Sequence, residues 1–132
     1  MSNTNGSQTI TEVPDRNVIV SACVGKTNIY ELKWLSETIL SIAKKWEHTG
    51  WAYIADCSQM SLVSPAESKE LVAMTKAFVN AGCEAFGFAE GKSVFLKIQA
   101  HNNTERSNTG ILEGHFETVD EALNWIKKTV KY

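Results

Sequence analysis

The sequence lacks both a strong net charge and any long apolar run. Its 13 Lys and Arg residues nearly balance its 15 Asp and Glu residues, which leaves a formal net charge of -2 over 132 residues. So weak a field does not attract polyanions, and we therefore expect no nucleic-acid partner. Because no segment approaches the roughly 18 consecutive apolar residues that span a bilayer, we expect no membrane insertion.

Cysteine is also scarce, and its pattern argues against disulfide bonds. Cys23, Cys57 and Cys83 are an odd number of thiols in apolar surroundings, which is typical of buried free cysteines in a reducing compartment. The segment from Met1 to Gln8 has neither the basic region nor the apolar region of a secretory signal. Together these features predict a cytoplasmic protein.

The length of the chain fits one domain with one hydrophobic core. Residues 1–8 are rich in Ser, Asn, Thr and Gly, so we expect a disordered tail there. The remaining residues, 9–132, are predicted to form a single α/β domain.

Within this domain the apolar pattern alternates between strands and helices. The β-branched segments 9–13 and 17–24 flank Pro14-Asp15-Arg16, a turn composition that predicts an opening hairpin. Asn28 and Glu31 have the spacing of a helix N-cap and its return partner. The elements predicted further on are a helix after Asn28, an apolar strand over 51–55, a helix after Ser64, strands over 85–89 and 111–116, and a helix after Thr118.

Two stretches of the chain allow more than one interpretation. Residues 93–102 fit either a helix or a strand, and we favour a helix. The polar stretch from Gln99 to Gly110 is either a partner-recognition loop or a disordered segment. The order of elements requires right-handed crossovers. It predicts an α/β fold with a mixed, mostly parallel β-sheet, an N-terminal antiparallel hairpin and about four α-helices.

Two segments resemble the STAS domains of anti-sigma-factor antagonists and the SpoIIAA-like proteins that share their fold. Residues 55–64, ADCSQMSLVS, resemble the STAS signature, in which a buried strand ends in Asp and leads through a polar loop into the next helix. Residues 115–123, HFETVDEAL, resemble the final strand and helix of that family. The resemblance implies a STAS-like regulatory domain that binds a protein partner, often an anti-sigma kinase, and is switched by serine phosphorylation.

The sequence departs from the family at this switch. The family's serine pair falls at Pro65 and Ala66, so Ala66 stands where the phosphoacceptor is expected. Ser64 and Ser68 lie nearby and are candidates for a displaced phosphorylation site, because the amino terminus of a helix stabilises a phosphate. The simpler interpretation is that Ser64 only caps the helix.

We therefore predict a non-catalytic regulatory module in a pathway of the anti-sigma type, with a kinase or another regulator as its partner and a homodimer as a further possibility. The predicted partner-binding residues are Ser58, Gln59, Met60, Ser61, Leu62, Ser64 and Ser68. One alternative is a pocket between helix and sheet that holds a small apolar ligand or a lipid. Another is an enzyme that uses Asp56 or Cys57, although no motif joins a nucleophile, a base and an orienting group.

The sequence predicts neither a metal site nor a cofactor. His48, His101 and His115 are remote from one another and fit no zinc-binding pattern. The segment 91–93, Gly-Lys-Ser, is more typical of a solvated turn than of a phosphate-binding loop. Trp34 and Trp125 lie off the main apolar stripes of their predicted helices, so these side chains either mark a contact surface or pack beneath loops.

Overall fold

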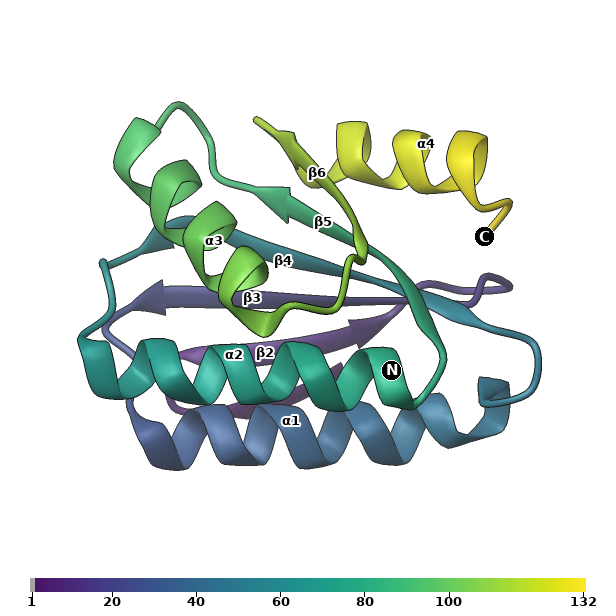
Figure 1. Ribbon diagram of the computed structural model, residues 1–132, viewed down its shortest axis with the longest axis horizontal. Helices are drawn as coiled ribbons and strands as arrows, with labels where there is room; N and C mark the ends of the chain where they lie inside the picture. Colours follow the sequence, from purple (N-terminus) through teal and green to yellow (C-terminus); the bar gives the residue numbers. More distant parts are fainter. Residues whose placement is uncertain (1) are drawn as a thin grey trace.

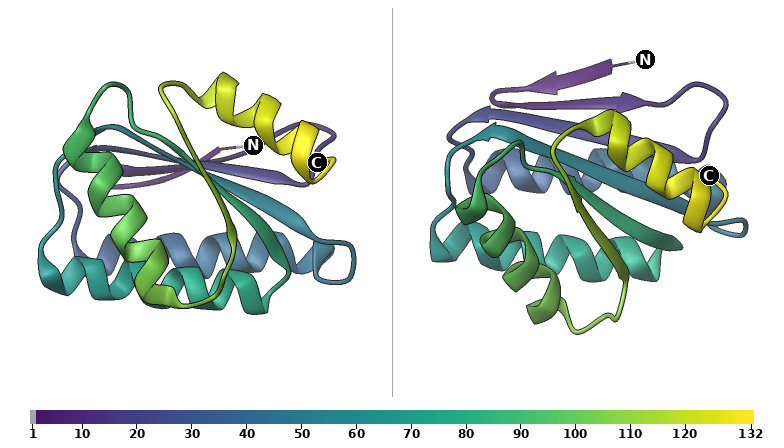
Figure 2. Two further views of the ribbon diagram at one scale, coloured as in Figure 1. Left: turned by 45° about the horizontal axis from the view of Figure 1, so that its top comes forward. Right: turned by 90° about the horizontal axis from the view of Figure 1, so that it is seen from above.

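The structure, a computed structural model, describes residues 2–132 and is built on one sheet. Its elements are β1 (Ser2–Asn5), β2 (Gln8–Glu12), β3 (Val18–Gly25), α1 (Ile29–Ala43), the short 3-10 helix η1 (Lys44–Trp46), β4 (Trp51–Met60), α2 (Pro65–Asn80), β5 (Cys83–Ala89), α3 (Val94–Ser107), β6 (Leu112–Phe116) and α4 (Val119–Thr129). The six strands follow one another across the sheet in chain order. Helices α1, α2 and α3 cover one face, and α4 covers the other (Figures 1 and 2).

The pairing of the strands confirms the predicted mixed sheet. β1, β2 and β3 are antiparallel neighbours, whereas β3, β4, β5 and β6 all run parallel to one another. β2 and β3 form the predicted hairpin around Pro14, and four α-helices accompany the sheet. The fold is therefore the α/β arrangement that the order of elements predicts, with a mixed, mostly parallel sheet.

The amino-terminal residues differ from the prediction. The sequence predicts a disordered tail over residues 1–8, but residues 2–8 form β1, a turn and the first residue of β2, while Met1 lies outside the described residues. β1 pairs with β2 from Ser2 opposite Thr11 to Asn5 opposite Gln8. Because the ladder is made by backbone groups, a polar strand at a sheet edge needs no apolar alternation, and composition does not reveal it.

Helix α1 begins as predicted, but one of its predicted contacts is different. The side chain of Asn28 accepts a hydrogen bond from the backbone of Glu31 at 2.9 Å and so caps the helix. The carboxylate of Glu31 does not complete a capping box; it accepts hydrogen bonds from Ser7 and Thr27 instead. This contact ties the start of α1 to the turn between β1 and β2.

The other helices begin at side-chain caps too. Ser64 forms the predicted capping box with Glu67, and Thr118 caps α4. Ser93 caps α3, which runs to Ser107 and so confirms the helical interpretation of residues 93–102. Most of the stretch 99–110 is therefore helical, and neither the loop nor the disordered segment considered for it is correct. None of the helices in the described residues is long and apolar enough to cross a membrane.

The larger part of the core is an aromatic cluster between the sheet and helices α1 and α2. Phe78, on α2, is fully buried, and its ring centroid lies 5.4 Å from that of Trp51 and 5.1 Å from that of Tyr53. Tyr53 also contacts Phe86, at 4.8 Å between centroids. A second cluster, around Ile126 and Ala122, joins α4 to the opposite face of the sheet.

Trp34 and Trp125, for which the sequence allows two interpretations, pack against these two core clusters. Trp34 lies partly buried against the core beneath α1 and α2, and Trp125 lies partly buried against the α4 cluster. The ring of Trp125 contacts Phe116, with 5.3 Å between centroids. Packing, rather than a contact surface, therefore accounts for both side chains.

Replacement of two phenylalanines tests this account of the core. Phe78→Ala should lower the free energy of unfolding by about 3–5 kcal/mol, because it leaves a cavity among packed rings. Phe95→Ala is the matched control, since Phe95 is 73% exposed, and it should change stability by no more than about 0.5 kcal/mol. Urea denaturation followed by circular dichroism measures both. Equal effects of the two substitutions would contradict the assignment of the core.

Candidate functional site

The carboxyl ends of the parallel strands gather at one edge of the sheet, where α1, α2 and α3 begin (Figure 1, left). Gly25 at the end of β3 lies beside Met60 at the end of β4, and Ser61 donates its backbone N–H to the Gly25 carbonyl at 2.9 Å. β5 ends one residue before Glu90 at the same edge. In open α/β sheets ligands and partners bind at this edge.

Strand β4 extends further than the sequence predicts. The sequence places a polar loop directly after Asp56, but β4 continues to Met60 because β3 supplies backbone partners as far as Gly25. β5 stops pairing at Ala89, opposite Asp56. Ser58 and Gln59 therefore lie exposed on a strand end that only β3 supports.

Asp56 has a structural role. Its carboxylate accepts hydrogen bonds from the backbone N–H of Ser58 at 3.2 Å and from the Ser58 hydroxyl at 2.7 Å. This local pattern is common where a strand leads into a turn. It is the arrangement that the sequence favours over a general acid or base.

Cys57 is poorly suited to act as a nucleophile. Its side chain is buried, and burial raises the pKa of the thiol to about 12, with further contributions from the charges of Glu90 and Asp56. A nucleophilic cysteine needs the opposite, a pKa that is lowered by positive neighbours. The environment of Cys57 thus argues against the enzyme alternative.

The reactivity of the thiols tests this conclusion. Burial also raises the pKa of Cys83 to about 12 and raises that of Cys23. All three cysteines are free and buried, so the native protein should react slowly with Ellman's reagent at pH 8 and completely once it is unfolded. A rapid reaction of the native protein that disappears in Cys57→Ser would show that Cys57 is activated after all.

A side chain of α3 holds the segment that follows β4. Gln99 accepts a hydrogen bond from the backbone N–H of Val63 and donates one to the Val63 carbonyl, both at 3.0 Å. This pair of bonds fixes the segment between Ser61 and Ser64 against α3. Val63 is buried as a result, and its neighbour Leu62 is directed to the surface.

Helix α3 buries three polar side chains and exposes large apolar ones. Its buried residues are Leu96, Asn103, Thr104 and Ser107. Phe95 and Ile98 are 73% and 52% exposed, and Leu62 beside them is 54% exposed. Leu62, Phe95 and Ile98 together line one depression, and we refer to these three residues as the α3 surface.

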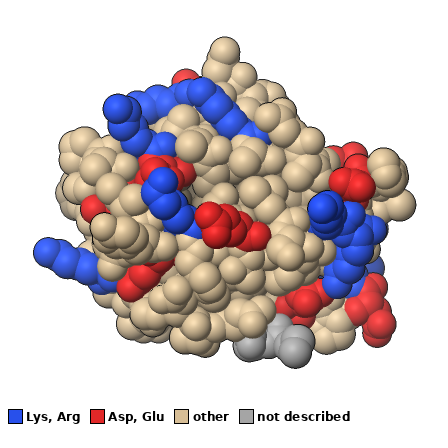
Figure 3. All heavy atoms as spheres, turned by 90° about the horizontal axis from the view of Figure 1, so that it is seen from below, with Lys and Arg blue, Asp and Glu red and all other residues tan. Residues whose placement is uncertain are grey.

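A groove of about 650 Å³ between α2 and α3 adjoins the α3 surface. Its apolar lining comes from Val63, which precedes α2, and from Val72 and other small side chains of α2. Lys69, Lys76 and Arg106 also line it, and the described residues that form this groove include no Asp or Glu. We refer to the groove with these three cationic side chains as the basic groove. Figure 3 shows the side of the molecule on which α1 and α2 lie, where Lys and Arg side chains gather along the upper edge and charges of both signs are interspersed over the rest.

Some of the predicted partner-binding residues are exposed, and others are buried. Met60 is half-buried and lines an internal cavity, and Ser68 is only 8% exposed. Neither side chain is available as the sequence predicts, because β4 carries Met60 inward and the first turn of α2 places Ser68 against α3. The exposed members of the predicted set are Ser58, Gln59, Ser61, Leu62 and Ser64.

Sequence reasoning missed Phe95 and Ile98. The periodicity of a helix over 93–102 predicts one face that carries Val94, Ile98 and His101, and apolar residues are the natural choice for a buried face. The structure exposes all three. One signal in the sequence could have pointed to an exposed apolar surface. The pair Val94-Phe95 lies in the first turn of a helix whose remaining residues are mostly polar.

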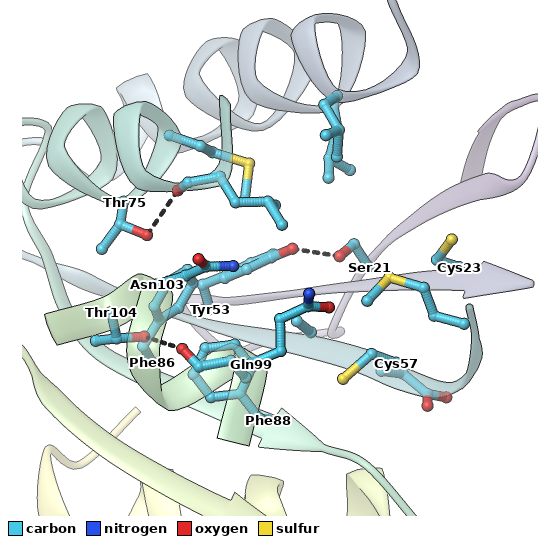
Figure 4. A pocket seen from close by; sticks show the side chains of 18 of the residues that line it. Ser21, Cys23, Tyr53, Cys57, Thr75, Phe86, Phe88, Gln99, Asn103 and Thr104 are labelled. Atoms are coloured by element: carbon cyan, nitrogen blue, oxygen red, sulfur yellow. Dashed lines mark hydrogen bonds between the residues drawn. The ribbon is translucent and has the colours of Figure 1, made fainter. Parts of the chain in front are cut away.

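A cavity lies beneath α3, between that helix, α2 and the sheet (Figure 4). It is lined mainly by apolar side chains, and the Asn103 carboxamide oxygen there is buried and has no protein hydrogen-bond partner. Its volume is about 70 Å³, whereas pockets for metabolites usually measure about 300–1,000 Å³. The cavity can take a few water molecules, one of which could satisfy Asn103. Its size argues against the lipid alternative.

Melting temperatures test that alternative. Because the cavity is too small for an acyl chain, medium-chain and long-chain fatty acids should leave the melting temperature unchanged at saturating concentrations. The matched variant is Ala100→Trp, which narrows a cavity lined by Ala100. A rise in melting temperature with a fatty acid, abolished by Ala100→Trp, would restore the ligand-binding interpretation.

The fold also brings together residues that are remote in the sequence. Ligand atoms of His101, Glu113 and His115 lie within 4.8 Å of one another, an arrangement that could hold a metal ion. Burial disfavours the charged form of His115, but hydrogen bonds to Glu90 and Glu113 outweigh that effect and raise its pKa. His48, the third histidine, is exposed, and its Nε2 atom lies 3.5 Å from a carboxylate oxygen of Glu47. The sequence predicts no metal site because these residues come from separate elements.

Comparison with solved structures identifies the fold. Over 95% of this chain and 98% of the other, it is similar to an uncharacterised protein with a SpoIIAA-like fold from Shewanella loihica, with a TM-score of 0.70 and 13% sequence identity. It is also similar to an anti-sigma factor antagonist from Mycobacterium paratuberculosis, over 92% and 95% of the two chains, with a TM-score of 0.57 and 17% identity. The chain therefore has a SpoIIAA-like, STAS-like fold. No family model and no curated protein matches the sequence.

Proposed function

We propose that this protein is a non-catalytic regulatory module that binds a protein partner through the α3 surface and the basic groove. The observation that carries the proposal is the exposure of Phe95 and Ile98 on α3 beside Leu62. Exposed apolar side chains that are contiguous and rimmed by polar residues are typical of protein interaction sites. Large side chains such as Phe supply much of the binding energy at such sites.

The charges of the groove indicate the chemistry of the partner. Lys69, Lys76 and Arg106 line it, although the chain as a whole carries a net charge of -2. A segment with apolar anchors for the α3 surface and acidic side chains for these cations would complement both parts. Complementary charge of this kind accelerates association and selects among partners.

Ser64 is the candidate for phosphorylation within this surface. It is exposed at the start of α2, whereas Ser68 is buried and is no longer proposed. The Ser64 side chain is hydrogen-bonded to Glu67, which lowers the pKa of that carboxyl group, and Lys26 contributes further. A phosphate on Ser64 would break the capping box by repelling Glu67 and would attract Lys26. It would thereby change the charge at the edge of the docking surface.

Similarity of fold supports a regulatory role, since one structural neighbour is an anti-sigma factor antagonist. On this proposal the partner is a kinase or another regulator, as in pathways of the anti-sigma type. The three buried free thiols fit a reducing compartment, so we place the protein in the cytoplasm.

Substitutions on the α3 surface test the proposal. The tagged protein is purified from its host, and a partner recovered in stoichiometric amounts is then titrated against purified variants by calorimetry. Leu62→Asp and Phe95→Asp should each weaken binding at least about 30-fold, the loss expected of an interface hot spot. Both residues are exposed, so the circular dichroism spectrum should not change. The matched control is Leu112→Asp, because Leu112 is also exposed but lies at the opposite end of the sheet.

Other outcomes of this experiment contradict particular parts of the proposal. Full binding by both Asp variants would show that the partner does not use the α3 surface. Loss of self-association in a sedimentation experiment, without loss of another partner, would make the surface a homodimer contact instead. Replacement of Lys69 by Glu should slow association with an acidic partner. An unchanged association rate would contradict the proposal that the partner is acidic. Phosphopeptides from the purified protein that never include Ser64 would remove the proposed phosphorylation site.

A further inference from the structure

Two histidines and a glutamate converge beneath the sheet edge formed by β6. Glu113 and His115 are two residues apart on β6, so their side chains share one face of that strand. His101 reaches them from α3. The Nδ1 atom of His101 lies 2.9 Å from Oε2 of Glu113, and Nε2 of His115 lies close to that same oxygen. Three potential metal ligands from two elements therefore point at one place.

The surroundings of His115 hold its ring in place. Its Nδ1 atom lies 2.8 Å from a carboxylate oxygen of Glu90, which is only 3% exposed. Nε2 of the same ring faces Glu113, so both ring nitrogens lie against carboxylates, and a metal ion bound to Nε2 would replace the proton shared with Glu113. The ring also stacks on Phe88, at 5.1 Å between centroids and 12° between planes. A buried carboxylate that bonds the far nitrogen of a histidine is the usual outer-shell partner of a metal ligand.

His101 has a similar but weaker arrangement. Its Nε2 atom lies 3.5 Å from the carboxylate of Glu105, one turn further along α3, while its Nδ1 atom points at Glu113. The side chain of His101 is half exposed, so an ion can enter from solvent and a water molecule can complete its coordination. The histidine on the helix thus forms the open side of the cluster, and the histidine on the strand forms the buried side.

We propose that His101, Glu113 and His115 form a binding site for a divalent transition-metal ion, with Zn²⁺ as the expected ion. Two imidazole nitrogens and one carboxylate oxygen are ligands that Zn²⁺ takes readily, and three protein ligands leave a fourth position for water. Mg²⁺ and Ca²⁺ bind mainly to oxygen atoms, so a set with two nitrogens selects against them. The site is independent of the docking surface, because none of its three ligands belongs to the α3 surface or the basic groove.

The distances between the three ligand atoms are close to those around a tetrahedrally coordinated ion. Bonds of about 2.0–2.1 Å to nitrogen and oxygen place neighbouring ligand atoms about 3.3 Å apart. The His101 and Glu113 atoms now lie 2.9 Å apart, and all three ligand atoms lie within 4.8 Å of one another. Small rotations of the Glu113 and His101 side chains are enough to reach the tetrahedral spacing. His115 can keep its contacts with Glu90 and Phe88 while these rotations occur.

Zinc binding by the purified full-length chain tests the proposal. The protein is treated with a chelator, dialysed and titrated with Zn²⁺ in competition with a chromophoric chelator, and Co²⁺ is used separately as a spectroscopic probe. We expect one Zn²⁺ per chain, a higher melting temperature with Zn²⁺, and the visible spectrum of a tetrahedral Co²⁺ site. Mg²⁺ and Ca²⁺ should produce no rise in melting temperature.

Variants separate this site from adventitious binding. His101→Ala and Glu113→Gln should each weaken Zn²⁺ binding at least about 100-fold, and Glu90→Gln should weaken it about 10–100-fold through the orientation of His115. The matched control is His48→Ala, since His48 is an exposed histidine elsewhere on the chain, and it should bind Zn²⁺ like the unmodified protein. Circular dichroism and urea denaturation establish that each variant is folded.

Two results would overturn the proposal. One is a folded protein that takes up no Zn²⁺ and shows no tetrahedral Co²⁺ spectrum. The other is Zn²⁺ binding that persists in His101→Ala and Glu113→Gln but is lost in His48→Ala. Phe95→Asp should retain Zn²⁺ binding, so failure of the metal site and failure of the docking surface are distinguishable.

Discussion

Parallel pairing of β3, β4 and β5 sends the carboxyl end of each strand to the same edge of the sheet. The helices that follow these strands all begin there, so their capped first turns and the segments that lead into them become neighbours. The α3 surface is built from two such neighbours, the segment before α2 and the first turns of α3. β6 continues the parallel arrangement and sets His115 opposite Phe88, which supports its ring. Both candidate sites depend on this pairing.

Helix α3 is the element in which stability and function compete most directly. Most helices of soluble proteins turn apolar side chains inward, but α3 buries Asn103, Thr104 and Ser107 and leaves Phe95 outside. Its polar side chains are accommodated by hydrogen bonds to nearby carbonyl oxygens, as when Thr104 donates to Ala100 and Ser107 donates to Thr104. Each such bond contributes only about 0.5–1.5 kcal/mol net, and its main effect is to satisfy polar groups that would be costly to bury without a partner.

Local patterns in the sequence predict most of the fold. The caps at Asn28, Ser64 and Thr118 and the apolar periodicity of their helices are local signals, and each predicted helix start is confirmed. The strand β1 is not predictable in this way, because its backbone pairing leaves no mark on composition. The continuation of β4 to Met60 depends on what β3 offers beside it.

The candidate sites were harder to predict because they depend on the tertiary arrangement. Leu62 lies in a segment that resembles the STAS signature, so the sequence could single it out. Phe95 could not be recognised, since nothing local indicates that α3 faces the sheet with its polar side. His101 and His115 are joined only by the packing of α3 against β6, and their separation along the chain concealed that contact.

The hydrogen bonds between Gln99 and Val63 have a consequence for how this protein and its relatives can diverge. Gln99 hydrogen-bonds to backbone atoms of Val63, and neither bond involves the side chains of Ser61 and Leu62. Ser61 and Leu62 can therefore be replaced during evolution without loss of the frame that presents them. On the proposed function, a change of partner would need new side chains at these positions and no change in the backbone hydrogen bonds that present them.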